Sequence, residues 1–502
     1  MKWDQNNPEK VKDFIAKMKQ NYAFKKAYAA RRAWEFYNHP DVAGMCYVAV
    51  GGLDSITLFL FLRSIGIEVP GTSVSMLEDR SIQKVHKALG IRALRPANGP
   101  KDRPYTKIEV IEILRHRGGT GKMKVYADHA ATTPMRPEAK EAMIEALEDF
   151  GNPSSIHAAG RLASAKMESA RKEIAELLNC RPAEVYFTSG GSEADNWAIR
   201  AARYGAGDVV ASAFEHHAVL HTLEAMERSG TRRAVLVAPG TNGIIDPAEI
   251  GRRVSSTTNM VTVMAANNEV GTLQPIQEIS KEIRKNGSKL TVFHTDAVQA
   301  VGHIPVDVQK MGVDMLSLSA HKFGGPKGIG VLYCRQGAQL DPLLYGGGQE
   351  RGRRPGTENV PAIAGMAAAM RTACENMEDS ANTVRSLRNR LLQRIGEIPG
   401  SCIYGSMEAR LPGNINCSFA GIEGETMVLM LDLAGICVSA GSACTSGSGE
   451  PSHVLTAMGL SRRDAYGAIR ITLGEENTTQ EVDYIAATIK NIVADLRKET
   501  RP

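Results

Sequence analysis

The feature that most limits the fold of this chain is a long alternation of strand-like and helix-like segments after Lys124. It runs for about 250 residues, the pattern of a doubly wound α/β domain with a mostly parallel sheet. Short apolar segments mark the expected strands: VYF at Val185, VVASA at Val209, AVLVAP at Ala234, VTVMAA at Val261 and LTVFHTDA at Leu290. We therefore predict an α/β fold with a large domain over residues 124–375.

Two further regions flank this domain. A long helical segment at 380–398, followed by mixed α/β sequence, predicts a small C-terminal domain over residues 376–502, against which the first residues of the large domain pack. Residues 1–120 contain an apolar run at 45–50, a glycine turn at 51–55 and a helical run. Strand, turn and helix form a unit whose helix N-terminus can hold phosphate, so we predict a partial nucleotide-binding-like α/β segment here.

The net charge of +5 is unevenly distributed. Residues 1–120 contain 20 Lys and Arg against 12 Asp and Glu, whereas the rest of the chain contains 40 against 43. A solvated helix face explains such a basic excess, and binding of a nucleic acid or nucleotide is the alternative. Any interaction with a polyanion is therefore expected at residues 1–120.

The eight cysteines are scattered without a CxxC pair. This spacing argues against a zinc module and a disulfide framework, and it predicts no metal site and a reducing, cytoplasmic location. No apolar run approaches the roughly 20 residues needed to cross a bilayer. The first segment, MKWDQNNPEKVKDF, lacks the apolar centre of a secretory signal.

Two neighbouring segments carry residue types suited to one cofactor site. Lys322 follows Ser319 and His321 in a glycine-rich loop, which suits a Schiff-base lysine beside an anion site. Asp296 and Gln299 lie at the end of the expected strand at 290, where an aspartate could pair with a protonated pyridine nitrogen. About one α/β step separates the two segments.

A third segment, TSGGSEADN at residues 188–196, could hold a phosphate through backbone N–H groups and the Ser192 hydroxyl. A glycine turn, a single lysine or a histidine such as His216 has an ordinary structural explanation when taken alone. Their order along the chain is more specific than any one of them.

In this order the segments resemble the cysteine desulfurases, pyridoxal 5'-phosphate (PLP) enzymes with the class V aminotransferase fold. The resemblance extends from Val125 to the C-terminus. It rests on YADHAATTP, GNPSSIH, TSGGSEADN, EHHAVL, ANNEVGTLQP, HTDAVQ, SLSAHKFGGPKGIG, GGGQERGRRPGT, SAGSACTSGS and AIRITLG. It implies a PLP-dependent transferase fold, L-cysteine as substrate and L-alanine as product.

The resemblance also implies the roles of individual residues. Lys322 would bond to the cofactor and move a proton, Asp296 would keep the pyridine nitrogen protonated, and His216 would stack on the ring. Arg470 would bind the substrate carboxylate beside Asn268, and the implied cofactor contacts are Gly191, Ser192, His216, Asn268, Asp296, Gln299, Ser319, His321, Lys322 and Thr357. Thr357 would reach the phosphate of a neighbouring subunit, which implies a homodimer.

Cys444 lies in the small, glycine-rich sequence SAGSACTSGS. The resemblance implies that its thiolate takes sulfur from L-cysteine as a persulfide and passes it to an acceptor, an iron–sulfur scaffold or a thiolation enzyme. The other cysteines that we assign to structural roles are Cys180, Cys334, Cys374, Cys402, Cys417 and Cys437.

Two questions stay open. One is whether the enzyme is instead a selenocysteine lyase, or chiefly a sulfur-delivery scaffold that docks an acceptor or a nucleic acid. The other is the front segment: VAVGGLDS at 48–55 resembles the SGGxDS loop of ATP pyrophosphatases and the phosphoadenylylsulfate (PAPS) reductase family, with Val50 in place of the serine. That segment is a truncated remnant, a nucleotide- or partner-binding adaptor, or an active domain.

Overall fold

The computed structural model describes residues 123–201, 207–440 and 451–499, together with three short strands near the N-terminus. Contacts divide the chain into two units, Met123–Ala494 and Met1–Lys122 with Asp495–Pro502. In the second unit, the described strands β1 (Val48–Ala49), β2 (Gly71–Ser73) and β3 (Arg92–Ala93) form a parallel sheet in that order. The glycine turn at 51–55 and Cys444 lie outside the described residues.

The larger unit is built around a seven-stranded sheet with the order β5-β11-β10-β9-β8-β6-β7. β11 is antiparallel to its neighbours β5 and β10, and the remaining pairs are parallel. Its strands are β5 (Val185–Thr188), β6 (Val209–Ser212), β7 (Ala234–Val237), β8 (Met260–Thr262), β9 (Val292–Asp296), β10 (Met315–Ser319) and β11 (Gly330–Cys334). The strands predicted from the sequence are confirmed.

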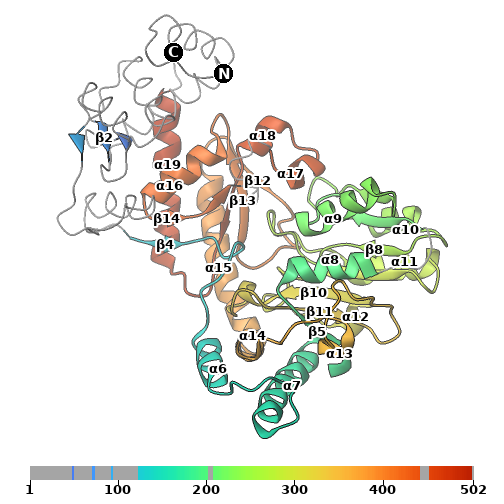
Figure 1. The fold of residues 1–502 in the computed structure, drawn as a ribbon. Helices are drawn as coiled ribbons and strands as arrows, with labels where there is room; N and C mark the ends of the chain where they lie inside the picture. Colours follow the sequence, from blue (N-terminus) through green and yellow to red (C-terminus); the bar gives the residue numbers. More distant parts are fainter. Residues whose placement is uncertain are drawn as a thin grey trace, which may run out of the picture. The chain divides into compact units, whose positions relative to one another are not determined.

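The inner strands of this sheet are buried on both faces, to which successive side chains point in alternation. In β6, Val209 and Ala211 pack with Trp197 of α8 (Gly191–Ala201), whereas Val210 packs in a second cluster with Ile174 of α7 (Ala158–Leu178). Figure 1 shows α8 on one side of the strands and α7 with α14 on the other. Helices on both faces make this a doubly wound α/β domain, as predicted.

The spacing of apolar residues along the helices around this sheet determines which face of each helix is buried. In α11, Ile276, Ile279 and Ile283 are buried and lie on one face, as expected for an amphipathic helix. The other helices and turns of this part are α6 (Pro137–Leu147), η1 (Pro182–Glu184), α9 (His217–Arg228), α10 (Pro247–Arg253), α11 (Ile276–Asn286), α12 (Val308–Met311), η2 (Ala320–Lys322), α13 (Gln349–Gly352) and α14 (Val360–Glu375).

A smaller antiparallel sheet follows in the sequence, with the order β12-β13-β16-β15. The strand β4 (Val125–Tyr126) pairs in parallel with β14 (Ile436–Cys437). The first residues of the larger unit therefore join this C-terminal part. Its elements are α15 (Met377–Gly396), β12 (Ser401–Tyr404), β13 (Asn414–Phe419), α16 (Gly424–Leu433), β14 (Ile436–Cys437), β15 (Ser439–Ala440), α17 (His453–Ala457), α18 (Arg462–Tyr466), β16 (Ile469–Thr472) and α19 (Thr479–Glu499).

The α/β fold with a large and a small sheet agrees with the predicted fold class. Among the described helices, none has the length and apolar character required to span a membrane.

Candidate active site

Lys322 lies just after the carboxyl end of β10, in the turn η2. Its side chain is partly buried, and Nζ donates hydrogen bonds to the carbonyl oxygens of Ala130 at 2.5 Å and Ala131 at 2.9 Å. Both carbonyls belong to the segment that follows β4. The amine is therefore directed against this segment at the carboxyl end of the large sheet.

Asp296 ends β9, which lies next to β10 in the sheet. Its Oδ1 accepts a hydrogen bond from the backbone N–H of Val298 at 2.8 Å. Burial raises the pKa of Asp296 to about 6, and the hydrogen bond from Val298 and the charge of Lys322 oppose this rise. Gln299 donates from Nε2 to the carbonyl of Ala130 at 3.0 Å, so Gln299 and Lys322 share one acceptor.

His216 precedes α9 and caps its N-terminus, where Nδ1 accepts from the backbone N–H of Ala218 at 3.1 Å. Burial lowers the pKa of His216, the positive charges of Lys322 and of neighbouring histidines add to this effect, and the resulting pKa is about 4. The imidazole is therefore neutral near pH 7.

The segment predicted to hold a phosphate lies at the start of α8 (Gly191–Ala201). Gly190 has φ +151°, and a methyl group added to it would lie 3.6 Å from the hydroxyl of Ser319. A methyl group at Gly191 would lie 2.6 Å from Cγ2 of Val298, so a larger residue here would require the Val298 side chain to shift. The exposed hydroxyl of Ser192 follows in the first turn. Free amides at a helix N-terminus with nearby hydroxyls suit a phosphate group.

Arg470 lies in β16 and is only 2% exposed. Its Nη2 donates to Oδ1 of Asp128 at 2.8 Å, and its Nη1 donates to the main-chain carbonyl of Asn268 at 3.1 Å. Among the described residues, its Nε has no hydrogen-bond partner although it is buried. A buried guanidinium with a donor to spare is suited to a carboxylate ligand.

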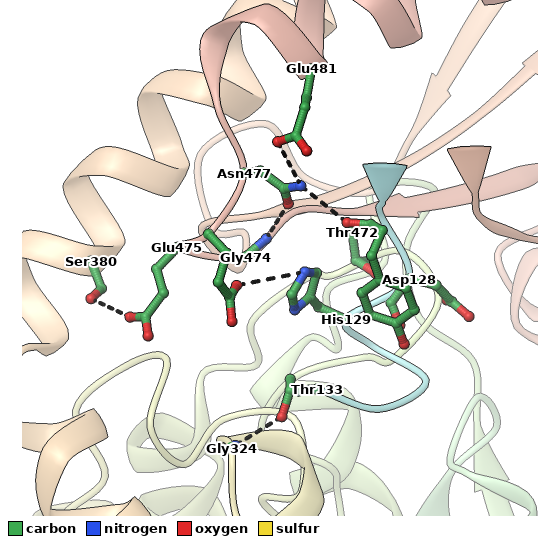
Figure 2. A network of polar contacts seen from close by, with 12 residues as sticks. Asp128, His129, Thr133, Gly324, Ser380, Thr472, Gly474, Glu475, Asn477 and Glu481 are labelled. Atoms are coloured by element: carbon green, nitrogen blue, oxygen red, sulfur yellow. Dashed lines mark hydrogen bonds and ion pairs between the residues drawn. The ribbon is translucent and has the colours of Figure 1, made fainter. Parts of the chain in front are cut away.

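The segment after β4 was given no role by sequence reasoning, yet it connects the two sheets. Thr133 donates its hydroxyl to the carbonyl of His321 at 2.9 Å and accepts from the N–H of Gly324 at 2.8 Å (Figure 2). On the other side, the Thr472 hydroxyl accepts from the N–H of Ala130 at 2.9 Å. The small, polar run AATTP was the available signal for this role.

The loop at 474–477 also packs against this segment. Asn477 donates to the carbonyl of Tyr126 at 3.1 Å and accepts from the N–H of Gly474 at 2.8 Å (Figure 2). A methyl group at Gly474 would lie 2.3 Å from the His129 ring, so only glycine fits there. The carbonyls that face Lys322 are thus fixed by the small sheet as well as by the large one.

The remaining predicted residues are placed differently. His321 brings Nδ1 to 3.1 Å from the hydroxyl of Thr132, and burial lowers its pKa to about 4. Asn268 presents its main-chain carbonyl, rather than its amide, to Arg470. Thr357 is exposed between α13 and α14 and takes part in none of the hydrogen bonds described above.

No disulfide links the six cysteines that the structure describes. Burial raises the pKa of Cys180, Cys334 and Cys417 to about 12, and that of Cys374 to about 11. The thiolate, which is the reactive form, is therefore scarce at these four positions near pH 7. The other two, Cys402 and Cys437, are exposed.

Glu215 is a buried carboxyl group beside His216. Its Oε1 accepts hydrogen bonds from the hydroxyl of Ser212 and from the N–H of Met264 at 2.7 Å. Burial raises its pKa to about 8, and these two hydrogen bonds oppose the rise. Its main-chain carbonyl lies 2.9 Å from Nε2 of His453, so this residue connects the end of β6 with α17.

The ionisation of Glu215 predicts a dependence of stability on pH. The unfolded chain releases this proton near the ordinary value of 4.5, whereas the folded chain holds it up to about pH 8. The contribution of Glu215 to the free energy of unfolding is therefore fully present below pH 4.5 and is lost as the pH rises to about 8. We expect Glu215→Gln to gain stability relative to wild type by about 1 kcal/mol per pH unit across this range.

Urea denaturation of both proteins at about pH 5 and about pH 8 measures this slope. Glu408→Gln, at an exposed position, is the control and should show a constant difference from wild type. An equally constant difference for Glu215→Gln would contradict the prediction.

The fold and the residues at the carboxyl ends of β6, β9 and β10 can be compared with those of known protein families. Residues 125–485 match the protein family described as Aminotransferase class-V. The chain is 45% identical over 383 residues to the cysteine desulfurase IscS of Methanosarcina thermophila, across 75% of this chain and 94% of that protein. It is 43% identical over 387 residues to the cysteine desulfurase IscS of Clostridium botulinum strain Hall, across 76% of this chain and 96% of that protein.

A solved structure titled NifS-like protein superposes with a TM-score of 0.70 at 39% sequence identity, over 74% of this chain and all of that one. The chain thus has the fold of the class V aminotransferases. Within that class it belongs to the cysteine desulfurase family, whose members are PLP enzymes that convert L-cysteine to L-alanine and retain the sulfur.

Proposed function

We propose that the catalytic centre of this desulfurase is formed by Lys322, Asp296 and His216. The observation that supports the proposal is their convergence at one edge of the sheet. Lys322 influences the pKa of both Asp296 and His216, and it shares the Ala130 carbonyl with Gln299. Ligands of open α/β sheets bind outside the carboxyl ends of the strands, which is where these residues lie.

The residues of this edge fit PLP. The backbone amides of Gly191 and Ser192, with the side chains of Ser319 and His321, would hold the phosphate at the N-terminus of α8. When bound, PLP supplies an electron sink for bonds broken at the substrate Cα. The carboxyl of Asp296 would hold a proton at the pyridine nitrogen, and burial makes that charge pair strong.

The proton transfers are assigned to two groups. Lys322 Nζ would take and return the proton at the substrate Cα, for which its half-buried position and carbonyl contacts give a fixed direction. His216, neutral near pH 7 because its pKa is lowered to about 4, can accept a proton there. Arg470 would bind the α-carboxylate of L-cysteine.

Cys444 is proposed as the sulfur acceptor. Its thiolate attacks the substrate sulfur and an S–S bond forms, while the C–S bond of the substrate breaks and its electron pair stays on Cβ. Cβ then takes a proton, so that the products are a cysteine persulfide and alanine. The sulfur then passes to an acceptor protein, for which an iron–sulfur scaffold or a thiolation enzyme is proposed. Because this chemistry requires a free thiol, we propose a reducing compartment such as the cytoplasm.

A homodimer is proposed as the working form. Phe150 and Ile156 are each 91% exposed and Tyr345 is 85% exposed in the single chain. Aromatic side chains such as Phe150 and Tyr345 are enriched at protein interfaces relative to the rest of the surface. Thr357 is exposed in the segment that follows Tyr345 and remains our candidate for contact with the phosphate in the neighbouring subunit.

For residues 1–120 we propose a partial nucleotide-binding-like α/β fold related to the PAPS reductases. The parallel pairing of β1, β2 and β3 supports an α/β arrangement. Nucleotide or nucleic-acid binding by this basic segment remains part of the proposal, beside the alternative of an inactive remnant.

The test is the product formed from L-cysteine by the PLP-bound enzyme in the presence of a dithiol. We expect alanine and sulfide in equal amounts, over many turnovers, and no alanine from D-cysteine. Pyruvate in place of alanine would contradict desulfuration in favour of β-elimination. A strong preference for L-selenocysteine would instead favour the selenocysteine lyase alternative.

A further inference from the structure

One acidic side chain, Asp128, is in direct contact with Arg470. Asp128 accepts from Arg470 Nη2 through Oδ1 at 2.8 Å, and from the hydroxyl of Ser439 through Oδ2 at 2.9 Å. Ser439 in β15 is the cross-strand neighbour of Arg470 in β16. The carboxylate of Asp128 therefore bridges two side chains that project from adjacent strands.

The main chain of Asp128 is fixed independently of this bridge. Asp128 forms an isolated β-bridge with Thr472, and the N–H of Thr472 donates to the carbonyl of Ala127 at 2.8 Å. Contacts of this kind leave the aspartate little freedom to follow the arginine. The guanidinium of Arg470 is carried by a long, flexible side chain, so Asp128 sets its position rather than the reverse.

A second carboxyl group, Glu269, lies within the electrostatic reach of Arg470 but has a different partner. It is 2% exposed, and its Oε2 accepts from the hydroxyl of Ser452 at 2.5 Å. Burial raises the pKa of Glu269 to about 7, and the hydrogen bond from Ser452 and the charge of Arg470 oppose the rise. Asp128 is thus the carboxylate that contacts the guanidinium directly.

Arg470 has donors left when these contacts are made. A guanidinium has five N–H groups, and the described contacts use one on Nη1 and one on Nη2. Nε is buried without a partner among the described residues. A substrate carboxylate therefore need not displace Asp128, because it can accept from the donors that remain.

We propose that Asp128 is a positioning residue that orients Arg470 for the substrate, and that this contact is the origin of selectivity for a free α-carboxylate. The proposal rests on the proposed function, in which Arg470 binds that carboxylate. Asp128 touches neither the substrate nor the cofactor in this scheme. It acts by holding one edge of the guanidinium so that the other edge meets the ligand without reorganisation.

The experiment compares kcat/KM for L-cysteine with kcat/KM for L-cysteine methyl ester, which lacks the negative charge. In wild type we expect a strong preference for L-cysteine. We expect Asp128→Ala to reduce this preference by about 10- to 100-fold, the range for a hydrogen bond to a charged group. The change should appear in KM for L-cysteine, whereas kcat for both substrates should stay near the wild-type value.

Two further variants serve as a partial rescue and as a control for the loss of substrate preference. Asp128→Asn keeps an acceptor oxygen for Arg470 and should restore part of the preference. Asp483→Ala removes a different ion pair, with Arg390 on the surface, and should leave the preference unchanged. If Asp128→Ala does not retain PLP, the Asp128→Asn variant carries the test on its own.

An equal loss of kcat/KM for both substrates in the Asp128 variants would overturn the proposal, because a merely structural role affects both alike. Arg470→Ala separates this outcome from failure of the proposed function. If Arg470→Ala keeps the preference for L-cysteine, Arg470 does not bind the carboxylate and the proposed function of the site fails. If Arg470→Ala abolishes the preference and the Asp128 variants do not alter it, only the positioning role fails.

Discussion

Replacing Lys322 by alanine is expected to reduce alanine formation from L-cysteine by at least about 10³-fold. Among the residues that the structure describes at this site, Lys322 carries the amine that can both bond to the cofactor and move the proton at the substrate Cα. In the structure it lies between the carbonyls of Ala130 and Ala131 and within electrostatic reach of Asp296 and His216. Removal of the amine leaves no group at this position to replace it.

The measurement is single-turnover alanine formation together with the PLP content of the purified variant. Lys327→Ala is the matched control, since this lysine lies in the same glycine-rich loop but is exposed. It should retain nearly all activity. Activity of Lys322→Ala comparable to that of the control would show that the catalytic amine lies elsewhere. Loss of activity in both variants alike would point to disruption of the loop.

The large sheet was predictable because its inner strands are buried on both faces. A strand such as β6 (Val209–Ser212) is a continuous apolar or small-residue run, and such runs separated by helical segments indicate a doubly wound domain. Strand ends were less predictable. β8 begins at Met260 and β9 at Val292, which shifts both by one or two residues from the expected starts.

Lys322, Asp296 and His216 could be predicted because each stands in a distinctive segment and because side-chain chemistry is visible in a sequence. The carbonyl oxygens of Ala130 and Ala131 could not, because every residue has one and only the fold decides where it points. The contact of Asp128 with Arg470 joins residues 342 positions apart, and no local pattern encodes such a pairing. The raised pKa of Glu215 follows from burial, which the sequence alone does not give.

Cys444→Ala is expected to lose persulfide formation and to reduce alanine release by at least about 100-fold. Cys444 lies outside the described residues. Its role is inferred from its sequence surroundings and from the protonation and exposure of the other cysteines. Four of those are kept protonated near pH 7 by burial, with pKa values of about 11 or 12. Of the described cysteines, only Cys402 and Cys437 are exposed to solvent.

The measurement is mass spectrometry of the intact protein and of its peptides after exposure to L-cysteine without reductant. Wild type should carry one additional sulfur atom, located on the peptide that contains Cys444. The Cys444→Ala variant should carry none and should still bind PLP, because the residues that we assign to the cofactor are unchanged. Cys437→Ala, the nearest described cysteine in the sequence, is the control and should acquire sulfur as wild type does. Added sulfur on Cys402 or Cys437 in wild type, with undiminished alanine release by Cys444→Ala, would transfer the role to one of those exposed thiols, since burial keeps the other four in the unreactive form.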